Sequence, residues 1–181
     1  MENVKAIIFD AYGTLFDVNS AAEKCKDKIG DKWEGFANFW RTTQLEYTWL
    51  RSLMDRHKDF WQVTKDSLDK SMRTFNIDTS MRNELLDLYK TLSPYKEVPE
   101  TLKTLKEKKF KLGILSNGTP SLLDELVKSN HLEKLFDDIF SIEQVGVYKP
   151  SSRVYDMPIK KYNIDKSEVA FLSANTWDVS G

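Results

Sequence analysis

Cysteine is nearly absent from this 181-residue sequence, which contains one, Cys25. A single cysteine cannot form an internal disulfide and leaves no zinc-ribbon spacing, which favours a reducing compartment. No apolar run approaches the ~20 residues that a membrane-spanning helix needs. The stretch before Asp10 is too short and too acidic for a signal peptide. We therefore expect a cytoplasmic protein with no membrane partner.

An excess of charge of one sign is also missing, and histidine is scarce. Lys and Arg number 27 against 28 Asp and Glu, so the formal net charge is −1. A chain so close to neutral has no overall attraction to nucleic acid, and we expect no nucleic-acid partner. His57 and His131 have no second histidine at metal-ligand spacing and offer no histidine-based triad. We predict neither a metal nor another cofactor.

The sequence does contain apolar strands that alternate with helices. Residues 4–10 form a β-branched apolar run that stops at a Tyr-Gly-Thr turn, which is typical of a buried parallel strand. Further strands are expected at 111–115, 139–142 and 168–172. Helices are expected between them, and Pro158 should kink or end the helix over 152–162.

Helical spacing dominates the segment that follows the first strand. Aromatic and aliphatic residues recur at helical intervals from Phe36 to Met54, and Asp59 is placed to cap a helix over 60–75. These patterns predict an α/β protein with a parallel, Rossmann-like sheet flanked by helices. Residues 1–16 and 93–181 form this core, and residues 17–92 form a helical-bundle cap inserted after the first strand.

Short polar side chains or a lysine follow each of the four expected strands. Ligands of open parallel sheets bind outside the carboxyl ends of the strands. One such residue alone is more often a cap or a turn former, but four strand ends together favour a binding site. The residues are Asp10 and Thr14, Ser116 and Asn117, Lys149, and Ser173, Asn175 and Asp178.

Asp10 has two interpretations from its position alone. A carboxylate at the end of a buried strand that faces a lysine is held ionised, and once desolvated it can act as a nucleophile. A plain turn cap explains the same position equally well.

Four short motifs in order resemble those of the haloacid dehalogenase superfamily. Within it, the chain is similar to the L-2-haloacid dehalogenases (type II), both at Phe39–Tyr47 and around Tyr148. Together the motifs cover essentially the whole chain. They are Asp-Ala-Tyr-Gly-Thr-Leu at 10–15, Ser-Asn-Gly at 116–118, Lys-Pro at 149–150 and Ser-Ala-Asn-Thr-Trp-Asp at 173–178.

The resemblance implies a hydrolase that converts L-2-haloalkanoic acids to D-2-hydroxy acids through an ester on Asp10. Arg41 and Asn117 would receive the halide, while Ser116 and the backbone amides after Asp10, from Ala11 onward, would bind the substrate carboxylate. The hydrolytic water would be held by Asp178, Asn175 and Lys149. The charged groups would be oriented by Thr14 and Ser173. An apolar wall would be formed by Tyr12, Leu45, Phe60 and Trp177.

Two alternatives remain open. A magnesium-dependent phosphatase of the superfamily needs carboxylates at positions that Tyr12 and Ala174 occupy here, which disfavours it. A catalytically inactive remnant of the fold, which binds a small carboxylate or a partner, is the other. We interpret Tyr155 as a helix-packing residue with its hydroxyl near Lys149.

The resemblance also implies that the last strand and helix of the family fold are missing from this chain. We expect an uncovered sheet edge and impaired activity, or a homodimer in which a second copy covers that edge.

Overall fold

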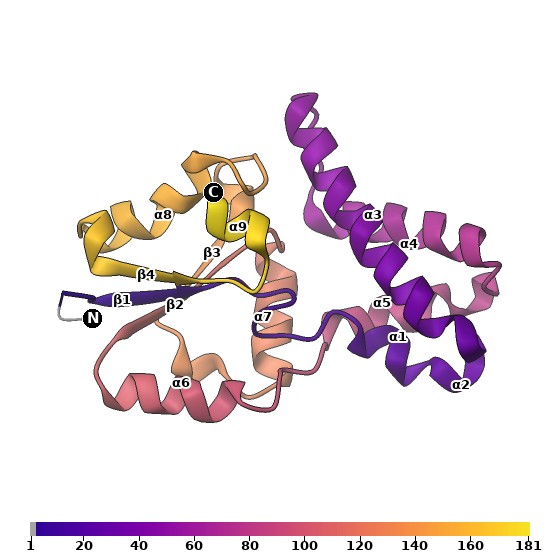
Figure 1. Cartoon of the computed structure of the whole chain (residues 1–181), viewed down its shortest axis with the longest axis horizontal. Coiled ribbons are helices and arrows are strands. Elements are labelled where there is room, and N and C mark those ends of the chain that lie inside the picture. The colour runs from indigo at the N-terminus through magenta and orange to yellow at the C-terminus, as the bar shows by residue number, and fades with distance from the viewer. Residues whose placement is uncertain (1–2) are drawn as a thin grey trace. The chain divides into compact units, whose positions relative to one another are not determined.

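The computed structural model describes residues 3–181, and its core is a four-stranded parallel sheet (Figure 1). The strand order is β3-β2-β1-β4. β1 lies in the middle and is buried along its whole length, because its four apolar residues are covered on both faces. The predicted parallel α/β sheet is confirmed. The strands are β1 (Ala6–Phe9), β2 (Lys111–Ser116), β3 (Asp138–Ser141) and β4 (Val169–Leu172).

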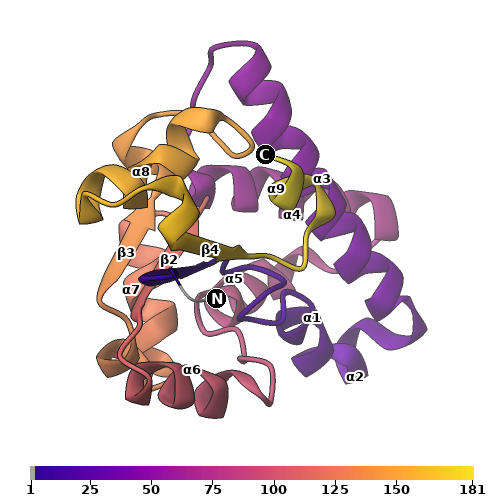
Figure 2. The ribbon, with the colours of Figure 1, turned by 60° about the vertical axis from the view of Figure 1, so that its left-hand side comes forward.

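Helices cover both faces of this sheet. α6 (Val98–Glu107) and α7 (Pro120–Ser129) lie on one face, and α8 (Ser152–Tyr162) lies on the other (Figures 1 and 2). The crossover from β3 at one edge to β4 at the other carries α8 to the opposite face. The short helix α9 (Thr176–Ser180) follows β4.

Of the two outcomes expected at Pro158, an early end of α8 does not occur. The helix runs through Pro158 to Tyr162 and ends at Asn163, which adopts a left-handed conformation. The Pro158 side chain is buried. Burial of apolar surface offsets the loss of one backbone N–H donor.

The segment after β1 forms the predicted bundle of helices. α3 packs along α4, where the indole N–H of Trp40 donates to the carbonyl of Thr64. Asp59 caps α4 as predicted by accepting from the backbone N–H of Gln62. The helices are α1 (Ser20–Lys24), α2 (Lys26–Ile29), α3 (Trp33–Leu53), α4 (Phe60–Phe75) and α5 (Arg82–Lys90).

Short 3-10 turns connect several of these elements. They are η1 (Gly30–Lys32), η2 (Thr79–Met81), η3 (Glu133–Leu135), η4 (Ile142–Gln144) and η5 (Lys166–Glu168).

The chain divides into two compact units. The sheet unit comprises Met1–Asp17 with Pro94–Gly181, and the helical unit comprises Val18–Ser93. The division predicted from the sequence lies one residue earlier at both boundaries.

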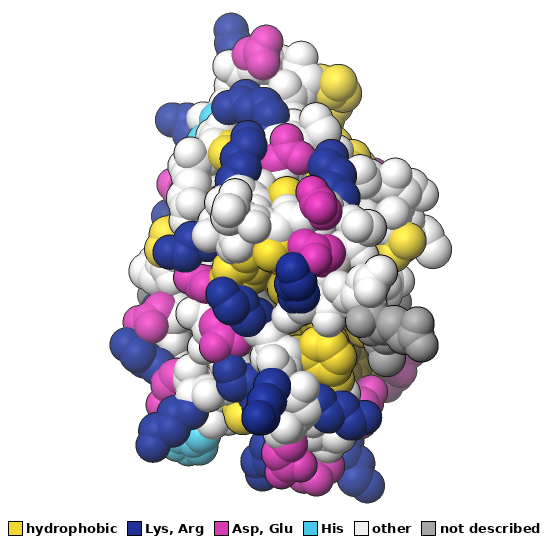
Figure 3. Space-filling view, turned by 90° about the vertical axis from the view of Figure 1, so that its left-hand side faces the viewer, with side chains coloured by type: hydrophobic (Ala, Val, Ile, Leu, Met, Phe, Trp, Pro, Cys, Tyr) yellow, Lys and Arg dark blue, Asp and Glu magenta, His cyan; other side chains and the backbone are white. Residues whose placement is uncertain are grey.

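Charged side chains of both signs are interspersed on the face shown in Figure 3. Such mixing gives that face no concentrated field of one sign. Among residues 3–181, no helix is both long enough and apolar enough to span a membrane.

Candidate active site

The candidate site is built where the four parallel strands of the sheet unit end. β1 stops at Phe9, so Asp10 follows directly, and the chain then turns at Gly13, whose φ of +88° favours glycine. Ser173 follows β4 in the same way. Lys149 comes from the loop after β3, and its peptide bond to Pro150 is cis.

Asp10 is 5% exposed and is held by donors from several segments. Its Oδ1 lies 3.0 Å from the Lys149 ammonium. Because a carboxylate oxygen carries two lone pairs, Oδ1 keeps one that this contact does not use. Its Oδ2 accepts hydrogen bonds from Asn175 (2.8 Å), Thr14 (3.1 Å) and Ser173 (3.4 Å).

Lys149 joins two buried carboxylates. Its Nζ lies 3.0 Å from Asp10 and 2.9 Å from Asp178, and all three side chains are at least nine-tenths buried. The backbone N–H of Lys149 donates to Oδ1 of Asn117, and its ammonium lies 5.1 Å from the centre of the Phe171 ring. The ammonium compensates charges that would be costly to bury alone.

The loop after β4 is tied to the loop after β1. The Thr14 hydroxyl accepts from the backbone N–H of Ala174 at 3.0 Å while it donates to Asp10. The Ser173 hydroxyl likewise accepts from the backbone N–H of Asn175. Each hydroxyl therefore has its proton directed toward Asp10 because its lone pairs face a backbone donor.

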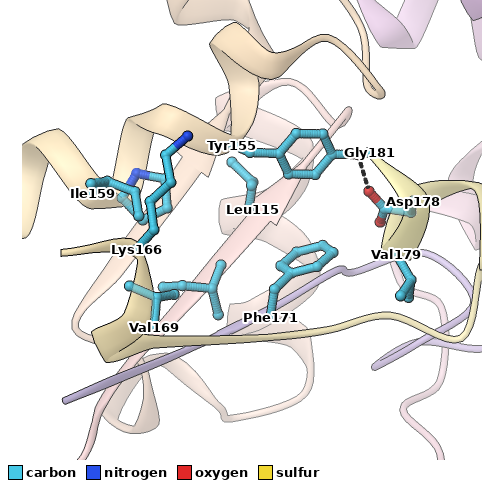
Figure 4. A pocket seen from close by; sticks show the side chains of 11 residues that line it. Leu115, Tyr155, Ile159, Lys166, Val169, Phe171, Asp178, Val179 and Gly181 are labelled. Carbon is cyan, nitrogen blue, oxygen red and sulfur yellow. Dashed lines mark hydrogen bonds between the residues drawn. The ribbon is translucent and has the colours of Figure 1, made fainter. Parts of the chain in front are cut away.

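Tyr155 is a site residue that the sequence predicts only as a helix-packing residue with its hydroxyl near Lys149. Its ring packs edge-on against Phe171, as a packing residue would, but its hydroxyl donates to Oδ1 of Asp178 at 2.6 Å (Figure 4). Burial, and then the Asp178 carboxylate, raises the pKa of Tyr155 well above its usual range, so the hydroxyl stays protonated. The available signal was a tyrosine in the first turn of a helix, six residues after Lys149.

A cavity of about 250 Å³ lies on the α8 face of the sheet beside Tyr155 (Figure 4). Apolar side chains such as Leu115, Val169 and Phe171 make up most of its lining, and Asp178 lies at its border. An apolar neighbourhood lowers the local dielectric and strengthens the interactions of the charged cluster.

Ser116 and Asn117 shape the turn after β2. The Ser116 hydroxyl accepts from the backbone N–H of Gly118, and the Asn117 side chain accepts from Lys149. A Cβ on Gly118 would lie 3.0 Å from the Tyr12 ring and 2.9 Å from Leu123, so this close approach requires glycine.

Ala11, Tyr12 and Trp177 border the same loops. The carbonyl of Ala11 accepts from Leu15 and Phe16, which closes the turn, and the buried Tyr12 accepts from Asn175 through its carbonyl. Trp177 is half-buried in the first turn of α9.

The other predicted residues belong to the helical unit. Arg41 and Leu45 lie one turn apart on α3, and Nη1 of Arg41 donates to Gln44. Phe60 is fully buried at the first position of α4. Within the sheet unit, direct hydrogen bonds connect Asp10, Thr14, Asn117, Lys149, Ser173, Asn175 and Asp178.

The carboxylates of the cluster are engaged by lysine. Asp10 and Asp178 share the ammonium of Lys149, and within residues 3–181 no three His, Cys, Asp or Glu residues are arranged to hold a metal ion.

Known proteins match this chain along its whole length. The family of haloacid dehalogenase-like hydrolases matches residues 4–181. The (S)-2-haloacid dehalogenase of Pseudomonas sp. strain YL is 42% identical over 183 residues, which span 100% of this chain and 79% of that protein. This chain belongs to the L-2-haloacid dehalogenase family. The resemblance drawn from the four motifs is confirmed.

Solved structures of L-2-haloacid dehalogenases and related dehalogenases share the fold. A crystal structure of a dehalogenase superposes with a TM-score of 0.97 at 36% identity, covering 99% of this chain and 80% of that chain. The L-2-haloacid dehalogenase from Xanthobacter autotrophicus, solved with chloropropionic acid covalently bound, gives a TM-score of 0.89 at 37% identity. That match covers 97% of this chain and 72% of the Xanthobacter chain.

Proposed function

We propose that this protein hydrolyses L-2-haloalkanoic acids to D-2-hydroxy acids through an ester on Asp10. The observation that carries the proposal is the environment of Asp10, a buried carboxylate with three hydrogen-bond donors on Oδ2 and an ammonium on Oδ1. The relatives support it, since they are (S)-2-haloacid dehalogenases and one holds chloropropionic acid covalently.

In the first step, Oδ1 of Asp10 attacks carbon 2 of the substrate from the side opposite the halogen. The C–O bond forms as the carbon–halogen bond breaks, and the halide leaves with the bonding electrons. Attack from the opposite side inverts the carbon, which accounts for the D product. Arg41 receives the halide with help from Asn117, because a guanidinium and an amide N–H both stabilise a developing anion.

The substrate carboxylate is bound by Ser116 and by backbone amides after Asp10. Tyr12, Leu45, Phe60 and Trp177 form an apolar wall that excludes bulk water. Exclusion of water strengthens the electrostatic interactions of Asp10 and protects the ester from uncontrolled hydrolysis.

In the second step, a water attacks Cγ of the Asp10 ester. Asp178 takes the proton of this water, which Asn175 and Lys149 help to hold. The ester breaks between Cγ and the oxygen that formed the new bond, so that oxygen leaves in the hydroxy acid. The water oxygen stays in the regenerated Asp10 carboxylate, and one proton and one halide are released per turnover.

The reaction proceeds without a metal in this proposal. A halide leaves unprotonated, so the first step needs neither a general acid nor a Lewis acid. Tyr12 and Ala174 stand where a magnesium phosphatase has carboxylates, and Asp10 and Asp178 are each paired with Lys149.

We also propose a homodimer located in the cytoplasm. The exposed side chains of Leu172 and Val179 beside the sheet edge support a partner copy there. The single cysteine, Cys25, is free, which favours a reducing compartment.

The first test is halide release from L-2-chloropropionate in the presence of EDTA, with Asp10→Asn beside the wild type. We expect release by the wild type and none by the variant. A single turnover in ¹⁸O-water should label Asp10 before it labels the product. Loss of activity with EDTA, or label that enters the product first, would contradict the proposal.

A further inference from the structure

Gln44 is a buried amide that contacts Arg41. It lies on α3, three residues after Arg41, and is 1% exposed. Its side-chain carbonyl, Oε1, accepts a 3.1 Å hydrogen bond from Nη1 of Arg41. Both residues belong to the helical unit.

The hydroxyl of Thr64 decides which way this amide points. Thr64 donates its one proton to the backbone carbonyl of Phe60 at 2.8 Å, so its oxygen can only accept from a further partner. The Gln44 amide nitrogen donates to that oxygen at 2.8 Å. The Tyr89 hydroxyl lies beside both ends of the amide, 3.0 Å from its nitrogen and 3.3 Å from its oxygen, so Thr64 is the partner that fixes the orientation. With the NH₂ group directed at Thr64, the carbonyl oxygen faces Arg41.

The partners of Gln44 are themselves held across three helices. The indole N–H of Trp40 on α3 donates to the backbone carbonyl of Thr64 on α4 at 3.1 Å. The Trp40 ring packs against Tyr89 of α5 with 5.2 Å between centroids. A buried network in which these donors have acceptors is rigid, so Gln44 offers Arg41 an acceptor at a fixed point.

The chemistry of an amide suits a guanidinium that must attract an anion. An amide oxygen accepts a hydrogen bond without a formal charge, so this contact does not neutralise the positive charge of Arg41. A carboxylate in the same place would form an ion pair and reduce that charge's effect on a halide.

We propose that Gln44 is a positioning residue, which holds the Arg41 guanidinium in the orientation that receives the departing halide. This inference rests on the proposed function of Arg41. It adds the buried network of Gln44, Thr64 and Tyr89 as the structural basis of that function.

The test compares Gln44→Met, which has similar length but no amide, with Gln44→Glu, which keeps an acceptor oxygen and adds a charge. Gln62→Met is the matched control, because Gln62 also lies in the helical unit but hydrogen-bonds Asp66. Turnover is measured with L-2-chloropropionate and L-2-bromopropionate. In NMR spectra the two Nη groups of Arg41 give separate resonances when rotation of the guanidinium is hindered, and Arg41→Lys assigns them.

We expect Q44M to lower kcat for the chloro substrate by about tenfold or more, and for the bromo substrate by less, since chloride is the poorer leaving group. The Nη resonances of Arg41 should merge in Q44M and stay separate in Q62M. In Q44E they should stay separate while chloride turnover still falls, because the added charge neutralises Arg41.

Equal losses on both substrates, or Nη resonances that stay separate in Q44M, would overturn the inference. If Q44M does not fold, the test rests on Q44E. Turnover by Q44E at the wild-type rate would then contradict the inference. If the wild type releases no halide, the proposed function fails, and the NMR comparison alone judges whether Gln44 orients Arg41.

Discussion

The hydroxyl of Tyr155 donates a 2.6 Å hydrogen bond to Oδ1 of Asp178, whose Oδ2 is held by Lys149. In the proposed second step Asp178 takes a proton from water, so its orientation controls the rate. We expect Tyr155→Phe to lower kcat for L-2-chloropropionate by about tenfold, as for other groups that orient a general base. Tyr162→Phe is the matched control on the same helix, and its kcat should equal that of the wild type. Equal loss in both variants would point to helix packing instead.

Alkaline pH should destabilise the protein in part through Tyr155. Burial and Asp178 raise the pKa of Tyr155 in the folded protein above the usual 10.0. Above pH 10 the unfolded chain therefore loses this proton while the folded protein keeps it, so stability that is complete below pH 10 declines as the pH rises. Urea titrations in steps of about half a pH unit between pH 9 and 11 measure the free energy of unfolding. This free energy should fall less steeply with pH in Y155F than in the wild type. Parallel slopes would contradict this.

Removal of the Lys149 ammonium should be costly. Lys149→Met leaves the buried carboxylates of Asp10 and Asp178 without their shared cation, and we expect it to lower the free energy of unfolding by about 3–5 kcal/mol. The double variant K149M/D178N should recover part of this loss because it removes one of the uncompensated charges. Urea denaturation of all three proteins measures both effects. A K149M variant as stable as the wild type would contradict the proposed pairing of Lys149 with Asp10 and Asp178.

The Thr14 hydroxyl should matter more than its methyl group. Thr14→Val removes the donor to Asp10 and the acceptor for the Ala174 N–H, and we expect kcat to fall by roughly tenfold or more. Thr14→Ser keeps both hydrogen bonds and should stay within about threefold of the wild type. Halide release is measured for both variants, and equal rates would mean that the hydroxyl does not orient Asp10.

Much of the fold could be predicted because local patterns carried it. The buried run before Asp10 predicted β1, and helical spacing with an Asp59 cap predicted α4 at its observed bounds. The parallel direction of the strands was predicted because the strands alternate with helices along the chain. The helix over 152–162 was also predicted at its observed bounds, and Pro158 does not end it, because burial in the sheet unit overrides the local preference.

The candidate site was predicted in outline and not in its connections. The rule that ligands bind at strand ends identified Asp10, Lys149 and Asp178 as neighbours. Tyr155 was predicted to lie near Lys149 but was given no role at the site, because a tyrosine on a helix has the same local pattern whether its hydroxyl meets water or a carboxylate. The roles of the predicted site residues stay predictions until the variants are measured.

The sequence by itself determined the strands, most of the helices, the order of the motifs and the membership of the family, because these depend on residue type and spacing along the chain. Only the tertiary structure decided that one ammonium joins Asp10 to Asp178 and that Gln44 turns its carbonyl to Arg41. The physical reason is that hydrogen bonds and ion pairs act over about 3 Å between atoms. Residues 139 positions apart reach that distance through the packing of the whole sheet unit.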